Sequence, residues 1–277
     1  MPPINTIHLF PILHEHLLTL LHSLTAADWQ LETICKGWTV KDITAHITDV
    51  QLRNISMYRD HYTPPGVPVI DTNQALVNYV NQLNNNWITA ARRLSPAILI
   101  EWLEQSLPQV HQLMKALPPF ENAIFAVSWA GEERSANWFH IAREYTEIWH
   151  HQQQIRLAVG QTAPLMTPEL YYPLLDTFMR ALPYTYRHTT APPGTLIEFT
   201  VTGPGGGSWY LQQHAGSWQL LADTPAAIVS TAVGIDGEIA WRLFTKGITR
   251  SAAQPYITIN GNEALGRPVL EMVAVVA

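Results

Sequence analysis

Apolar residues recur at steps of three and four along most of the first 160 residues, which is the spacing of one face of an α-helix. The chain opens this way with IHLFPILHEHLLTLLHSL, and later segments repeat the pattern. A proline-dense stretch at 63–71 interrupts it and predicts a loop. We interpret this half as four long amphipathic helices joined by loops, which together predict a helix bundle.

Local signals mark where some of these helices begin and end. Thr39, with Asp42 three residues later, resembles a capping box, so it predicts a helix start. Ser95 precedes a proline, which is favoured in a first helical turn. The last long helix is expected from about Ala136 to Ala158, since Gly160 follows it and glycine favours helix ends.

The second half changes character. After a predicted helix near 167–182, polar and apolar residues alternate through TLIEFTVTGPGGGSWYLQQHAGSWQLL, with turns at 203–207 and 215–216. Such alternation predicts antiparallel strands. The remainder predicts strand, helix, strand, helix. The fold class is therefore α+β, with a bundle domain at 1–162 and a smaller α+β domain at 163–277.

Composition narrows the classes of function. Hydrophobic residues make up 47% and charged residues 14% of the chain, which predicts a globular protein. A formal charge of -6 without a basic run argues against nucleic acid as a partner. The lone Cys35 excludes an internal disulfide, and the N-terminus lacks a secretory pattern, so we expect a cytoplasmic protein. The sequence has no apolar stretch long enough to predict a membrane-spanning helix. We expect a monomer or a homodimer.

The last predicted helix of the bundle carries a polar stripe. His140, Glu144, Glu147 and His151 stand at offsets 0, 4, 7 and 11, hence on one helix face. Glu147 and His151 can then direct an oxygen and a nitrogen at one point, as a metal ion requires. His140 and Glu144 can extend such a site as a fourth ligand or a base. The alternative is an ordinary solvated helix face.

A third candidate ligand lies about 100 residues earlier. His46 is flanked by apolar residues in VKDITAHITDV, with Asp42 and Asp49 on its helix face. Because metal-bound histidines commonly donate their second N–H to a carboxylate, either aspartate is a candidate partner. The alternative is a histidine that is simply hydrogen-bonded within the bundle.

Four stretches of the chain resemble one family. CKGWTVKDITAHI at 35–47 and TEIWHHQQQIRLAVG at 146–160 are similar to two helices of the mycothiol-dependent maleylpyruvate isomerases and related proteins of the DinB-like superfamily. EIAWRLFTKG and the final ITINGNEALGRPVLEMVAVVA look like the family's C-terminal domain, a sterol-carrier-protein-like α+β unit. The resemblance implies a DinB-like bundle in the N-terminal half.

The resemblance further implies that His46, Glu147 and His151 bind a divalent metal, usually zinc, although nickel or iron(II) suits the same donors. Three ligands leave a position open for water, substrate or a thiol such as mycothiol or another low-molecular-weight thiol. In the family's isomerase such a thiolate adds to the cis double bond of maleylpyruvate, lets it rotate and leaves.

The resemblance also implies a catalytic arginine, for which Arg242 is the candidate ahead of Arg267, with a solvated helix arginine as the alternative. The sequence departs from the family pattern at two places: Lys36 replaces a proline, and the glutamines at 152–154 replace a stretch with an aspartate. The identities of the thiol and the substrate therefore stay open. His150 points about 100 degrees away from His151 around the helix and is expected to be a packing or surface residue.

Cys35 lies near a helix start, which can lower a thiol pKa, yet we expect a structural role for it. Two hypotheses follow from the whole pattern. The first is a metal- and thiol-dependent isomerase or transferase that acts on a small molecule. The second is a non-catalytic metal or small-ligand binding protein with the same fold.

Overall fold

The computed structural model describes residues 2–276, which form two compact units. The helical unit comprises residues 6–121, 147–164 and 276. The sheet unit comprises residues 2–5, 122–146 and 165–275. Neither unit is one continuous stretch, because the chain passes between them several times, once inside a helix.

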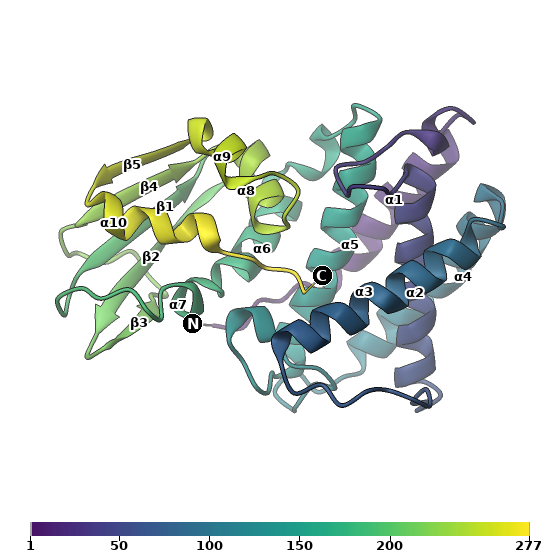
Figure 1. Ribbon diagram of the computed structural model, residues 1–277, viewed down its shortest axis with the longest axis horizontal. Coiled ribbons are helices and arrows are strands. Elements are labelled where there is room, and N and C mark those ends of the chain that lie inside the picture. The colour runs from purple at the N-terminus through teal and green to yellow at the C-terminus, as the bar shows by residue number, and fades with distance from the viewer. Residues whose placement is uncertain (1, 277) are drawn as a thin grey trace. The chain divides into compact units, whose positions relative to one another are not determined.

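Long helices build the helical unit (Figure 1). They are α1 (Phe10–Ser23), α2 (Val40–Tyr58), α3 (Asn73–Ala91), α4 (Pro96–Lys115) and the part of α5 (Asn137–Ala158) that follows Thr146. Within residues 2–276 the N-terminal half thus has five long helices, one more than the four predicted. α3 packs beside α2, where the Trp87 indole N–H donates to the Ala45 carbonyl at 2.8 Å.

One apolar core joins α1, α2, α4 and the end of α5. Its members on one helix recur at three- and four-residue steps, which is the amphipathic pattern expected of a bundle. The buried residues of this core are Leu17, Leu20, Leu21, Trp29, Val40, Ile43, Ile47, Leu103, Leu107 and Ile155. A second cluster attaches α3 to α2 and α4 through Ala45, Ile88, Ala91 and Leu99. The backbone that carries His46 is therefore held by buried neighbours on both sides.

A five-stranded sheet lies at the centre of the sheet unit, counted over residues 2–276. Its spatial order is β3-β2-β1-β4-β5, with β1 and β4 parallel and the other pairs antiparallel. The strands are β1 (Leu196–Val201), β2 (Gly207–His214), β3 (Ser217–Leu220), β4 (Thr231–Ile235) and β5 (Ile257–Gly261). The predicted antiparallel run corresponds to β1, β2 and β3.

The turn between β1 and β2 depends on glycine. A Cβ placed on Gly206 would lie 2.0 Å from the Val201 carbonyl oxygen, so a side chain has no room there. The Gly206 N–H donates to the Gly203 carbonyl at 3.0 Å and closes the turn. The glycine-rich turn predicted at 203–207 is thus confirmed, and its cause is close backbone approach.

Shorter helices accompany the sheet. They are α6 (Pro168–Met179), α7 (Leu182–Thr185), α8 (Gly237–Phe244), α9 (Arg250–Ala253) and α10 (Glu263–Gly266). α7 contacts β3, and α10 contacts β4 and β5 (Figure 1). Short 3-10 helices occupy Ile7–Leu9, Asp28–Gln30, Ser128–Ala130, Ala163–Leu165, Gln254–Tyr256 and Arg267–Glu271. The predicted order of strand, helix, strand, helix after residue 225 is confirmed by β4, α8, β5 and α10.

The predicted fold class, a helical N-terminal region followed by an α+β region with a mainly antiparallel sheet, is confirmed. The domain boundary at 162/163 and the sterol-carrier-protein-like character of the second domain stay predictions. The compact units differ from the predicted domains mainly in residues 122–146, which belong to the sheet unit. Within the described part of the chain, no helix combines the length and the apolar character that crossing a membrane requires.

Candidate metal centre

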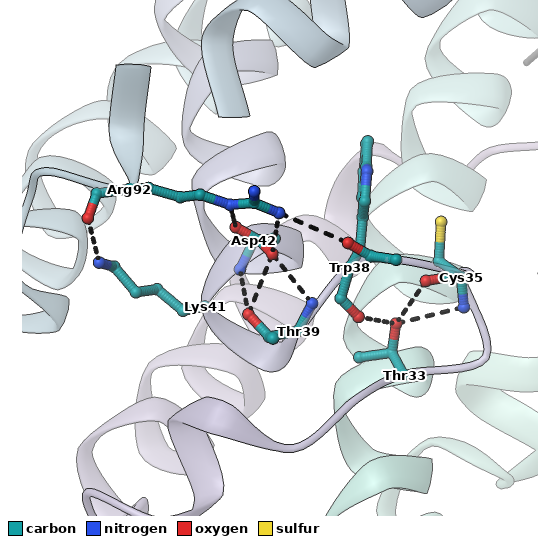
Figure 2. Close-up of polar contacts among 8 residues, drawn as sticks. Thr33, Cys35, Trp38, Thr39, Lys41, Asp42 and Arg92 are labelled. Atoms are coloured by element: carbon teal, nitrogen blue, oxygen red, sulfur yellow. Dashed lines mark hydrogen bonds and ion pairs between the residues drawn. The ribbon is translucent and has the colours of Figure 1, made fainter. Parts of the chain in front are cut away.

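The first turn of α2 is fixed by the capping box that the sequence predicted (Figure 2). The Thr39 hydroxyl oxygen accepts from the Asp42 N–H at 3.3 Å, and the Asp42 carboxylate accepts from the Thr39 N–H at 3.1 Å. These bonds satisfy N–H groups that have no partner within the helix. His46 lies just over one turn further along α2, so the capped first turn fixes the backbone that leads to it.

An arginine from the end of α3 strengthens the same turn. Arg92 donates through Nε and Nη2 to the two oxygens of Asp42, each at 3.1 Å (Figure 2). Lys41 in turn donates to the Arg92 carbonyl at 2.9 Å. Burial alone raises the pKa of the Asp42 carboxyl, but the hydrogen bonds from Arg92 and Thr39 outweigh it and lower that pKa below its usual range.

The two aspartates do not orient His46, so the expectation that one of them hydrogen-bonds its imidazole is wrong. Asp42 is engaged by Thr39 and Arg92. Asp49 pairs with Arg53, whose Nε lies 3.0 Å from its carboxylate oxygen. Both acids share a helix face with His46, but each is paired with an arginine instead.

The loop before α2 presents an indole to His46. The Thr33 hydroxyl donates to the Trp38 carbonyl at 2.9 Å (Figure 2). The Trp38 N–H donates to the Cys35 carbonyl at 2.9 Å. The Trp38 and His46 rings lie with centroids 5.1 Å apart. Trp38 therefore covers one side of the His46 ring, a contact that the sequence analysis missed.

Cys35, in the same loop, is half-buried beside the apolar core. Burial raises the pKa of its thiol, so the helix start does not activate it. The expected structural role fits this environment.

The structure brings His46, Glu147 and His151 together. One ligand atom from each residue lies within 4.8 Å of the others. The His46 and His151 rings meet edge to face with centroids 4.5 Å apart, and Nε2 of His151 lies 3.5 Å from Oε2 of Glu147. One acid and two imidazoles from α2 and α5 therefore converge on one point of the helical unit.

The electrostatics of His46 favour a neutral, lone-pair-bearing ring. Nδ1 of His46 is buried, and no hydrogen-bond partner for it exists among residues 2–276. Burial, and secondarily His151, hold the pKa of His46 well below its usual value, while Glu147 opposes them. A buried polar atom without a partner is costly. Two neutral imidazoles and one carboxylate are the donor set of catalytic zinc sites, so these residues fit a divalent ion.

His151 has a second contact on the other side of its ring. Its Nδ1 lies 3.0 Å from Oε1 of Gln154, a buried residue three positions later on α5. Sequence reasoning treated the glutamines at 152–154 only as a departure from the family pattern. The spacing of three was the available signal, since residues that far apart share a helix face.

The remaining histidine and acid candidates lie outside this cluster. His150 is buried, with its ring centroid 3.9 Å from that of His151, and it is not a member of the ligand group found within the described residues. His140 and Glu144 belong to the part of α5 in the sheet unit, where both contact Arg143. Burial, with Arg143 second, lowers the pKa of His140 to about 4. Neither residue joins the three ligand candidates in residues 2–276.

The arginine candidates belong to the sheet unit. Arg242 lies on α8 with Nη2 3.4 Å from Oε2 of Glu238, and its buried Nε has no hydrogen-bond partner among the described residues. Arg267 is exposed and forms an ion pair with Glu263. A catalytic role for Arg242 stays a prediction.

The fold and the site together define an α+β protein with a His-Glu-His candidate metal centre on its helices. The model of the mycothiol maleylpyruvate isomerase N-terminal domain family matches residues 10–156, which is more than half of the chain. The protein belongs to this family. All three ligand candidates lie within the matched residues.

Solved structures support the fold over nearly the whole chain. A histidine-to-alanine mutant of the mycothiol-dependent maleylpyruvate isomerase superposes with a TM-score of 0.54 at 13% identity, covering 94% of this chain and 93% of that one. A second crystal structure of the mycothiol-dependent maleylpyruvate isomerase gives a TM-score of 0.51 at 12% identity with the same coverage. At these identities the likeness shows the fold alone. No curated protein shows a significant match to the sequence.

Proposed function

We propose that this protein is a metal-dependent isomerase or transferase that uses a low-molecular-weight thiol, with His46, Glu147 and His151 as the metal ligands. The observation that carries the proposal is the approach of one ligand atom from each of these residues to within 4.8 Å of the others. Membership of the maleylpyruvate isomerase family supports the thiol and the type of reaction.

The donor set favours zinc, and nickel or iron(II) are the alternatives that accept the same ligands. When bound, the ion supplies a Lewis acid that lowers the pKa of a coordinated thiol or water. His46 and His151 contribute neutral nitrogens, and Glu147 contributes the single negative charge. Three protein ligands leave an open position, which distinguishes a catalytic arrangement from a closed structural one.

Mycothiol is the first thiol to test, because the relatives of known structure are named as mycothiol-dependent. The substrate is a small molecule with a double bond or another group that a thiolate can attack. Arg242 is the proposed catalytic arginine, and its guanidinium is paired with Glu238 at 3.4 Å. A cytoplasmic location, where thiols stay reduced, is part of the same proposal.

Elemental analysis of the untagged protein is the first test. We expect about one equivalent of metal in the wild type and none in the His46→Ala variant. The matched control is His22→Ala, which removes an exposed histidine of α1 that pairs with Glu104 at 2.9 Å. The control variant should keep its metal.

The second test measures turnover of a cis-alkene acid such as maleylpyruvate with and without added thiol. Thiol-dependent turnover that is lost in His46→Ala supports the enzyme. Stoichiometric metal without any thiol or substrate effect would instead favour the non-catalytic binding protein. A metal-free wild type after growth with zinc would overturn the proposal.

A further inference from the structure

We infer that Gln154 is a positioning residue that fixes the tautomer of His151, with the hydrogen on Nδ1 and the lone pair of Nε2 facing Glu147. The inference rests on the proposed function for its purpose, because a lone pair in this direction is what a metal ion needs. It adds to the three ligands a fourth residue with a defined task.

The two nitrogens of the His151 ring have different surroundings. Nδ1 lies 3.0 Å from the amide oxygen of Gln154, whereas Nε2 lies 3.5 Å from the carboxylate of Glu147. A neutral imidazole carries one N–H and one lone pair. An amide oxygen only accepts hydrogen bonds, so the 3.0 Å contact assigns the hydrogen to Nδ1 and the lone pair to Nε2; the Glu147 carboxylate is the competing acceptor for a hydrogen on Nε2, and at 3.5 Å it is the farther of the two.

The side chains are held well enough for this bond to set the tautomer. Gln154 is 5% exposed and His151 is 9% exposed, so water competes little for either group. Both stand on α5 three positions apart, and the helix fixes their spacing. The contact therefore forms before any ligand arrives, as is usual for residues that orient metal-bound histidines.

The choice of an amide also affects charge. Gln154 is neutral, so it adds no charge beside His151, and a divalent ion held by Glu147, His46 and His151 would keep a net positive charge. A glutamate at 154 would preserve the acceptor and add a negative charge. Substitution can thus separate the two properties of Gln154, which are that its amide oxygen accepts a hydrogen bond and that its side chain carries no charge.

Three variants test the inference. Gln154→Met keeps the shape and removes the acceptor, and Gln154→Glu keeps the acceptor and adds charge. Gln152→Met is the matched control, because Gln152 is also buried on α5 and its amide has no hydrogen-bond partner among residues 2–276. Nitrogen-15 NMR of the metal-free proteins at mildly alkaline pH reports the His151 tautomer, and competition with a chromophoric chelator reports the zinc dissociation constant.

We expect the Nδ1–H tautomer of His151 in the wild type, Gln154→Glu and Gln152→Met, and a mixture or the Nε2–H form in Gln154→Met. Zinc binding should weaken roughly 10- to 100-fold in Gln154→Met, stay unchanged in Gln152→Met and be at least as tight as in the wild type in Gln154→Glu. The Nε2–H form in the wild type, or an unchanged tautomer in Gln154→Met, overturns the inference.

The NMR measurement needs no metal, so it separates the two claims. A wild type that binds no zinc yet shows the expected tautomers removes the proposed function and leaves the role of Gln154 in setting the His151 tautomer. If the wild type and Gln154→Met bind zinc with the same affinity, the proposed function stands and the role of Gln154 in positioning the ligand is removed.

Discussion

The indole of Trp38 lies beside the imidazole of His46, with their ring planes inclined by 53°. The contact links the loop before α2 to a ligand candidate inside that helix. Because indole fluorescence responds to nearby groups, we expect zinc addition to change the emission of the wild type. The Trp38→Phe variant should bind zinc but lose most of this change.

Trp102 provides the control for this measurement, since it lies in α4 with its ring against Trp87. The Trp102→Phe variant should keep the zinc response. If Trp38→Phe responds to zinc as the wild type does, the metal binds elsewhere.

Removal of His46 should have opposite effects on the two forms of the protein. In the metal-free form, His46→Leu removes a buried nitrogen that has no protein partner in residues 2–276. Such an unpaired nitrogen reduces the free energy of unfolding by about 1–3 kcal/mol. Its midpoint of thermal unfolding should therefore equal or exceed that of the wild type. Zinc at about 100 times its dissociation constant should stabilise the wild type by about 2.7 kcal/mol and leave the variant unchanged. Equal zinc-induced shifts in both proteins would contradict the ligand assignment.

His14 should make stability depend on pH. It is buried in α1, and burial, with His111 second, lowers its pKa to about 3 in the folded protein. The unfolded chain binds this proton with a pKa of 6.5. The unfolded state thus holds more protons between these values, so stability rises with pH across the interval and is lost as pH falls from 6.5.

The His14→Leu variant tests this assignment. Between pH 6 and pH 4 the wild type should lose about 1.4 kcal/mol per pH unit relative to the variant. Urea unfolding at several pH values measures the difference. Parallel stability curves for the two proteins would show that His14 is protonated without cost.

The Asp42–Arg92 pair should contribute more through Asp42 than through Arg92. Asp42 is buried and also caps α2, so Asp42→Asn should cost about 1 kcal/mol or more. Arg92 is 56% exposed in its side chain, and solvent screening should keep the coupling between the two residues below about 1 kcal/mol. A double-mutant cycle in urea with Asp42→Asn and Arg92→Ala measures both values. A coupling well above this limit would mean that the ion pair is more shielded than its exposure indicates.

Much of the fold follows from local patterns that the sequence displays. The capping box at Thr39, the helix end before Gly160 and the glycine turn before β2 each depend on neighbours within a few residues, and each is confirmed. The approach of His46 to Glu147 and His151 was expected because a resemblance linked two distant helices.

The contacts between residues far apart in the chain left no local pattern in the sequence from which they could be predicted. Arg92 reaches Asp42 across 50 positions, and only the packing of α3 on α2 brings them together. The parallel pairing of β1 with β4 likewise depends on a connection that passes through two other strands. Local alternation predicts that a segment is a strand but not which strand lies beside it.

The ligand candidates span residues 46–151, and the last of them stands inside α5, seven residues before that helix ends. Under the proposed function, every metal ligand therefore precedes the first residue of α6, and so does Gln154. Under that proposal, changes in the later sequence leave all of the metal's side-chain ligands in place. Such a layout would let natural selection retain one inorganic centre while the sequence that follows it varies.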